Sequence, residues 1–98
     1  MWRHGDVLIQ TCDGIPINAR RLPHLILAKG ELTGHAHRIR EREGNELYQF
    51  GGEFYLQVAR TPATVIHEEH GDISLEPGTY RIWIQREYSP EAIRRVVD

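Results

Sequence analysis

The chain has 98 residues, a formal net charge of −2 and an apolar fraction of 40%. This length supports one modest hydrophobic core, so we expect a single domain over residues 1–98. The 12 basic residues are balanced by 14 acidic ones, so the charge indicates no nucleic-acid partner, and the apolar fraction argues against a disordered chain. Six histidines are the unusual feature of the composition.

We expect neither an export signal nor a membrane span in this sequence. Residues Met1 to Asp6 lack the apolar stretch of a secretory signal, and there is no long apolar run elsewhere. Because Cys12 is the single cysteine, it cannot form an intramolecular disulfide. We therefore expect a cytoplasmic protein.

Turn residues interrupt the chain at short, nearly regular intervals, and the segments between them are rich in β-branched and aromatic residues. This pattern predicts an all-β domain, a small antiparallel β-barrel or sandwich. Gly51-Gly52 predicts a two-residue hairpin turn, because glycine reaches the positive φ angles that such turns need. A proline at each end of Pro16–Pro23 favours a loop or a single helical turn there. The expected strands are Asp6–Gln10, His24–Ala28, Leu32–Arg40, Glu46–Phe50, Glu53–Ala59, Ala63–Glu68, Ile73–Leu75 and Thr79–Arg86.

The end of the chain changes period. Ile93, Val96 and Val97 follow a helical spacing after Ser89-Pro90-Glu91, in which serine suits a cap and proline the first helical position. We expect a short C-terminal helix that covers a barrel end or a sheet edge.

The first histidine cluster lies on an expected strand. Alternation places His35 and His37 on the same face as Ile39, towards the core, while Arg38 and Arg40 face solvent. Two imidazoles two residues apart on one strand face can converge on a single ion. This cluster therefore predicts one half of a metal site.

The second cluster is His67-Glu68-Glu69-His70, at the end of another expected strand. His67 is in phase with the inward residues of that strand, and His70 lies in the following turn. Neutral imidazoles dominate near pH 7 and suit zinc, iron, manganese or nickel. The sequence thus predicts a site for a divalent transition metal. Its candidate ligands are His35, His37, His67, His70 and Glu41.

The other two histidines, His4 and His24, are interpreted as incidental. His4 opens the tetrapeptide His4-Gly5-Asp6-Val7, which resembles His70-Gly71-Asp72-Ile73. We interpret the two tetrapeptides as separate turns that enter strands.

The spacing His35-x-His37-x-x-x-Glu41 resembles the first motif of the cupin family, and residues 71–78 resemble the opening of the second. The histidine of that second motif is absent, and His67 and His70 could replace it. The resemblance implies a cupin-like small β-barrel with an oxygenase, isomerase or metal-binding role. Gly-His-Ala-His and His-Glu-Glu-His are also similar to stretches of small bacterial and phage proteins, a likeness that implies no activity.

Three functions fit these features. The first is a metal site in which an open position activates water or polarises a small-molecule substrate, with Glu68 or Glu69 as general base. If all four clustered histidines bind, the ion would instead be structural.

The second function is a metal-independent phosphodiester hydrolase that uses two histidines as acid and base, with Arg38, Arg40 or Arg81 binding the anion. The third is a non-catalytic interaction module in which the histidines form a pH-sensitive hydrogen-bond network. A homodimer would cover Trp83, which is out of phase with the inward residues of its strand.

Overall fold

The structure is a computed structural model that describes residues 1–29 and 34–85. Strands, turns and loops make up this part of the chain. These described residues contain no helix that is long and apolar enough to cross a membrane. The strands are β1 (Trp2–His4), β2 (Val7–Thr11), β3 (Arg20–Arg21), β4 (Ile26–Lys29), β5 (Ala36–Ile39), β6 (Asn45–Phe50), β7 (Glu53–Val58), β8 (Ala63–Ile66), β9 (Ile73–Leu75) and β10 (Gly78–Ile84).

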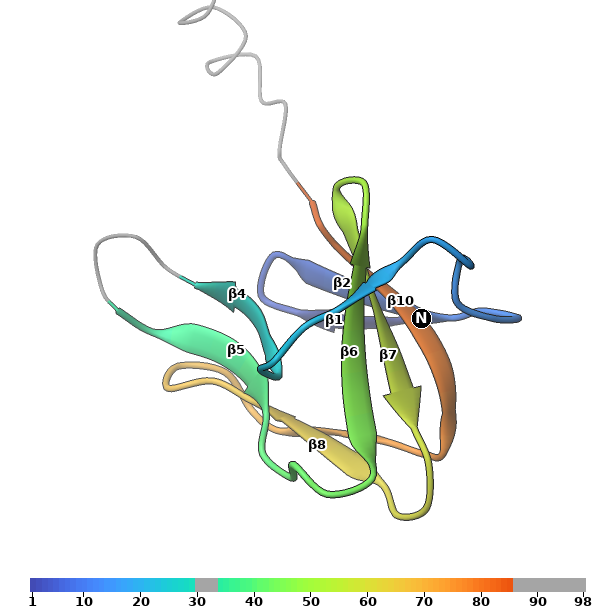
Figure 1. Cartoon of the computed structure of the whole chain (residues 1–98). Helices are drawn as coiled ribbons and strands as arrows, with labels where there is room; N and C mark the ends of the chain where they lie inside the picture. Colours follow the sequence, from blue (N-terminus) through green and yellow to red (C-terminus); the bar gives the residue numbers. More distant parts are fainter. Residues whose placement is uncertain (30–33, 86–98) are drawn as a thin grey trace, which may run out of the picture.

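These strands form two antiparallel sheets (Figure 1). The larger sheet has the order β1-β2-β10-β7-β6-β3, and the smaller has the order β4-β5-β8-β9. The expected all-β class is therefore confirmed. The described strands pair within two separate sheets, so a closed cupin-like barrel is not confirmed, and the expected C-terminal helix lies outside the described residues.

The two sheets share one hydrophobic core. Alternate residues point inward in strands such as β2 and β8, where Val7, Ile9 and Val65 have no exposed surface. Burying one such side chain fully is worth about 1.5–3 kcal/mol. The core residues are Val7, Ile9, Leu47, Leu56, Val58, Tyr80 and Ile82 from the larger sheet and Leu27, Ile39, Ala63, Val65 and Leu75 from the smaller.

The expected hairpin between β6 and β7 is confirmed. Phe50 pairs with Glu53 across the turn, and Gly51 has a φ of 62°. The turn therefore takes the geometry that the two glycines predicted.

Two strands were not expected. β1 is a three-residue strand that pairs with β2 through a turn at Gly5-Asp6. β3 has only two residues, which pair with Tyr48 and Gln49 of β6, so the segment between Pro16 and Pro23 is not only a loop or helical turn. A strand of two or three residues is too short to show a two-residue period in the sequence. It forms because it pairs with a neighbouring strand.

Three parts of the chain surround the histidines. β5 and β8 are neighbours in the smaller sheet, with Arg38 opposite Ile66, which brings the residues just before and after this pair together. β1 lies at the edge of the larger sheet, and its His4 reaches the carbonyl oxygen of Gly71, just before β9. The site therefore lies where the edge of one sheet meets the β8–β9 connection of the other.

Candidate metal centre

Three imidazoles converge at this place. His37 comes from β5, and His67 and His70 come from the β8–β9 connection. One ring nitrogen of each lies within 4.8 Å of the other two. The ring centroids are 4.2 Å apart for His37 and His67 and 4.7 Å apart for His67 and His70. His37 is buried, His67 half-buried and His70 exposed, so the group opens to solvent on one side.

The strand alternation of β5 places His37 in the interior. His37 and Ile39 are buried while Arg38 and Arg40 are exposed, as the sequence predicted. Burial, and after it the nearby His67, lower the pKa of His37 to about 4. The His37 ring is therefore neutral near pH 7 and keeps a lone pair for a ligand bond.

His4, which the sequence marked as incidental, belongs to the same cluster. The residue is 2% exposed, and its Nδ1 lies 2.8 Å from Nδ1 of His37. Its Nε2 lies 2.9 Å from the carbonyl oxygen of Gly71. The repeated His-Gly-Asp tripeptide was the signal that could have indicated this, because the two copies meet at the site.

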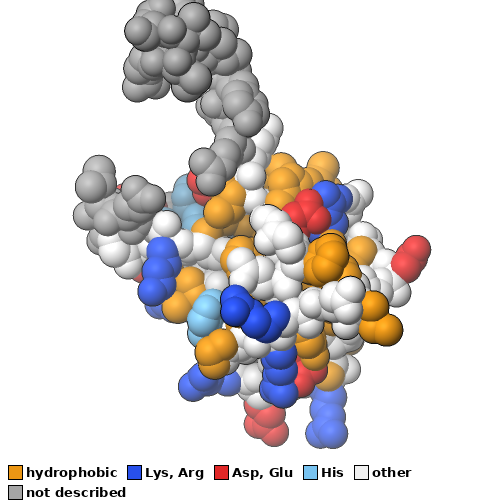
Figure 2. All heavy atoms as spheres, turned by 45° about the horizontal axis from the view of Figure 1, so that its top comes forward, with side chains coloured by type: hydrophobic (Ala, Val, Ile, Leu, Met, Phe, Trp, Pro, Cys, Tyr) orange, Lys and Arg blue, Asp and Glu red, His pale blue; other side chains and the backbone are white. Residues whose placement is uncertain are grey.

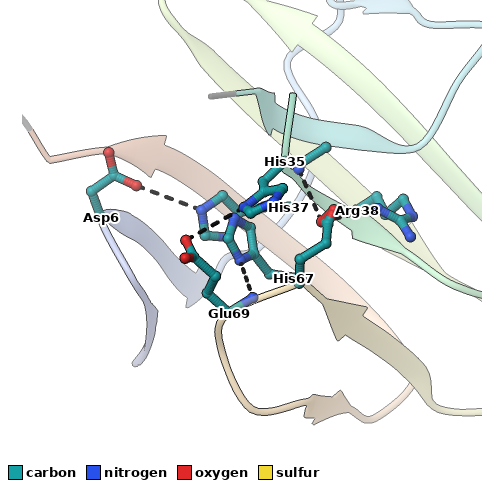
Figure 3. A network of polar contacts seen from close by, with 8 residues as sticks. Asp6, His35, His37, Arg38, His67 and Glu69 are labelled. Carbon is teal, nitrogen blue, oxygen red and sulfur yellow. Dashed lines mark hydrogen bonds and ion pairs between the residues drawn. The ribbon is translucent and has the colours of Figure 1, made fainter. Parts of the chain in front are cut away.

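The turn between β1 and β2 closes over the cluster. Gly5 has a φ of +65°, and a Cβ there would lie 2.8 Å from Nε2 of His70 and 3.1 Å from Cε1 of His37. Both the backbone angle and the close packing therefore favour glycine at this position. The next residue, Asp6, places a carboxylate oxygen 3.7 Å from Nε2 of His37 (Figure 3).

The ring of His67 is held by a backbone donor. The N–H of Glu69 donates to Nδ1 of His67 over 2.9 Å, so the neutral ring carries its proton on Nε2. Ligation by His67 therefore needs one of two changes: the ion displaces the Glu69 N–H from Nδ1, or the ring proton leaves Nε2 for Nδ1.

Two of the five expected ligands lie elsewhere. Nδ1 of His35 lies 3.4 Å from the carboxylate of Glu69, and its ring packs edge-on against His67, outside the group of three. The Glu41 carboxylate accepts hydrogen bonds from the N–H and the hydroxyl of Thr64, each at 2.7 Å. The structure thus brings together His37, His67 and His70, and it directs Glu41 to a structural contact.

The two expected general bases have partners of their own. Glu68 accepts the N–H of Ala36 at 3.2 Å and pairs with Arg38 at 3.5 Å. The hydrogen bond from Ala36 lowers the pKa of Glu68, which makes this carboxylate a weaker base. Glu69 faces His35 (Figure 3).

The arginines proposed to bind an anion are also engaged. Arg38 pairs with Glu68, Arg40 approaches Asp72 at 3.8 Å, and Nε of Arg81 donates to Glu53 at 2.9 Å. On the face drawn in Figure 2, basic and acidic side chains are interspersed.

Arg81 also bears on the out-of-phase aromatic residue. Its guanidinium lies 4.6 Å from the ring centroid of the half-buried Trp83, which gives this side chain a partner within the chain. A homodimer through Trp83 stays a prediction.

Residues 3–85 match the model of a family described as a domain of unknown function, DUF8820. The chain belongs to this family. The matched segment spans all the described histidines of the cluster, from His4 to His70. No match to a cupin model was found, so the cupin resemblance is not confirmed. Comparisons with curated proteins and with solved structures gave no match.

Proposed function

We propose that this protein binds one divalent transition-metal ion through His37, His67 and His70. The observation that carries the proposal is the convergence of three imidazole nitrogens within 4.8 Å. Nitrogen ligands of a tetrahedral ion, at bonds of about 2.0–2.1 Å, lie roughly 3.4 Å apart. A side-chain shift on the order of 1 Å would therefore close the group around an ion.

The electrostatics of the cluster favour a metal over protons. The pKa of His37 is lowered first by burial and then by His67, so this ring disfavours protonation. A metal ion uses neutral rings, and the carboxylate of Asp6 at 3.7 Å from His37 would attract it. This combination of neutral donors with one nearby anion supports a divalent cation.

Three histidines leave one position of a tetrahedral ion for another group. Because His70 is exposed, that position would be reachable from solvent. The bound ion could then polarise a small-molecule substrate or activate a water molecule. Asp6 stands beside His37, where its carboxylate could complete the ligand set or accept a proton from that water. The donor set of imidazole with carboxylate suits zinc, iron, manganese and nickel.

Calorimetric titration of untagged, chelator-stripped protein with Zn²⁺ and Ni²⁺ tests the proposal. We expect one ion per chain. An ion at a hundred times its dissociation constant stabilises the fold by about 2.7 kcal/mol, which corresponds to a melting-temperature rise of roughly 10–20 °C. The exposed ligand gives the test variant, His70→Ala, which should lose most of the affinity. The matched control is His24→Ala, outside the cluster, which should bind as the wild type does.

The proposal fails if the wild type binds neither these two ions nor Mn²⁺ or Fe²⁺. It also fails if His24→Ala loses as much affinity as His70→Ala, because binding would then not depend on the cluster.

A further inference from the structure

A chain of hydrogen bonds runs from Gly71 through His4 to His37. Nε2 of His4 lies 2.9 Å from the carbonyl oxygen of Gly71, and a carbonyl oxygen can only accept. Nε2 of His4 must therefore carry a hydrogen and act as the donor of this hydrogen bond. The other nitrogen of the same ring, Nδ1, lies 2.8 Å from Nδ1 of His37.

The tautomer of His4 then decides the tautomer of His37. His4 is buried, and the Gly71 carbonyl oxygen needs a donor, so the neutral His4 ring carries its single proton on Nε2. Its Nδ1 consequently accepts, and Nδ1 of His37 must donate. The neutral His37 ring thereby keeps a lone pair on Nε2.

The nitrogen that keeps this lone pair faces an anionic group. Nε2 of His37 faces the carboxylate of Asp6 at 3.7 Å (Figure 3). With the proton on Nδ1, both of these atoms are acceptors, and nothing in the pair donates. A nitrogen lone pair and a carboxylate that face each other suit a shared cation.

We infer that His4 is a positioning residue that holds His37 in the tautomer with Nε2 free for the metal. The inference rests on the proposed metal site and deepens it. Groups that orient a metal ligand in this way typically change metal affinity by about 10–100-fold when they are removed. His37 is thereby pre-set for ligation, whereas His67 must first give up or rearrange its bond with the Glu69 N–H.

Both copies of the His-Gly-Asp tripeptide contribute residues to this site. The first supplies His4, which orients His37, and Asp6, which faces it. The second supplies the ligand His70 and the Gly71 carbonyl that orients His4. The proposed ion would therefore lie between a turn of the larger sheet and a turn of the smaller sheet.

Two variants of His4 separate its hydrogen bond from its volume. His4→Phe fills the space but removes the acceptor, and His4→Asn keeps an oxygen that can accept the Nδ1 proton of His37. His24→Phe is the matched control, a histidine outside the cluster. The tautomer of His37 is measured in the metal-free proteins by long-range ¹H–¹⁵N NMR of the imidazole rings, and Zn²⁺ affinity by competition with a chelating dye.

We expect Nδ1 of His37 to carry the proton in the wild type and to lose that preference in His4→Phe. Zn²⁺ affinity should fall about 10–100-fold in His4→Phe, recover in large part in His4→Asn and stay unchanged in His24→Phe. The ¹⁵N shifts of His4 should show no direct bond to Zn²⁺.

Three results would overturn the inference: a proton on Nε2 of His37 in the metal-free wild type, unchanged Zn²⁺ affinity in a folded His4→Phe, or a ¹⁵N shift showing that His4 binds Zn²⁺ directly. If His4→Phe does not fold, the wild-type tautomer and the His4→Asn affinity still decide it. Failure of the wild type to bind any metal would remove the proposed function, and the tautomer measurement would still decide the role of His4.

Discussion

Replacing Gly5 by alanine tests whether the β1–β2 turn closes the histidine cluster. The protein contains a matched control in Gly51, because both glycines occupy the first central position of a two-residue hairpin turn. Their φ angles are +65° and +62°. A Cβ at Gly5 would lie 2.8 Å from Nε2 of His70, whereas a Cβ at Gly51 would meet nothing within 4 Å.

The expected effects divide into a shared part and a specific part. Both alanines pay the cost of a positive φ, about 1–2 kcal/mol, which lowers the melting temperature by roughly 4–8 °C per kcal/mol. Only Gly5→Ala must also move a ring. Ordinary contact begins at 3.4 Å, so His70 has to retreat by about 0.6 Å, the difference between 3.4 and 2.8 Å.

His70 yields more easily than His37 because His70 is exposed and His37 is buried. A displaced ligand should cost Gly5→Ala about tenfold in Zn²⁺ affinity, or roughly 1.4 kcal/mol. Gly51→Ala should keep the wild-type affinity.

Thermal melts of the metal-free proteins and Zn²⁺ titrations of both variants provide the measurement. Equal loss of stability in the two variants, together with wild-type Zn²⁺ affinity in Gly5→Ala, would show that the turn does not pack on the rings.

Three further predictions follow from the site. The pKa of His37 lies at about 4 in the folded protein, below its ordinary value of 6.5, so the folded state binds fewer protons between these values. The metal-free protein should therefore lose up to about 3 kcal/mol of stability as the pH falls through this window, and denaturant titrations of His37→Leu should show a smaller loss. Glu41→Gln should cost about 1–3 kcal/mol, because a neutral amide replaces the charged acceptor of both Thr64 donors, yet leave Zn²⁺ affinity unchanged; a loss of affinity would restore Glu41 as a ligand. Zn²⁺ should change the amide hydrogen exchange of Glu69, because ligation by His67 disturbs that bond, and an unchanged amide would argue that His67 is not a ligand.

Local patterns were sufficient for much of the fold. The hairpin of β6 and β7 could be predicted because its turn and its two strands are adjacent in the chain. The inward direction of His37 followed from strand alternation alone, since a period of two residues fixes which side chains share a face. Both features depend only on residues that are close together in the sequence.

The ligand role expected for Glu41 shows where local spacing stops being informative. β5 ends at Ile39, so the alternation that orients His37 does not extend to Glu41. Its carboxylate turns instead to Thr64 of the neighbouring strand β8. A spacing motif predicts the direction of a side chain only within the strand that contains it.

The amino-acid order was enough to predict an all-β chain with two histidine clusters and with His37 on an inward strand face, whereas His35 precedes the strand. Tertiary structure decided which imidazoles meet, because His37 and the His67–His70 turn become neighbours only through the pairing of β5 with β8. It also decided the role of His4, whose partners lie 33 and 67 residues away along the chain. The physical reason is that side-chain direction is local, whereas convergence on one ion depends on the packing of two sheets.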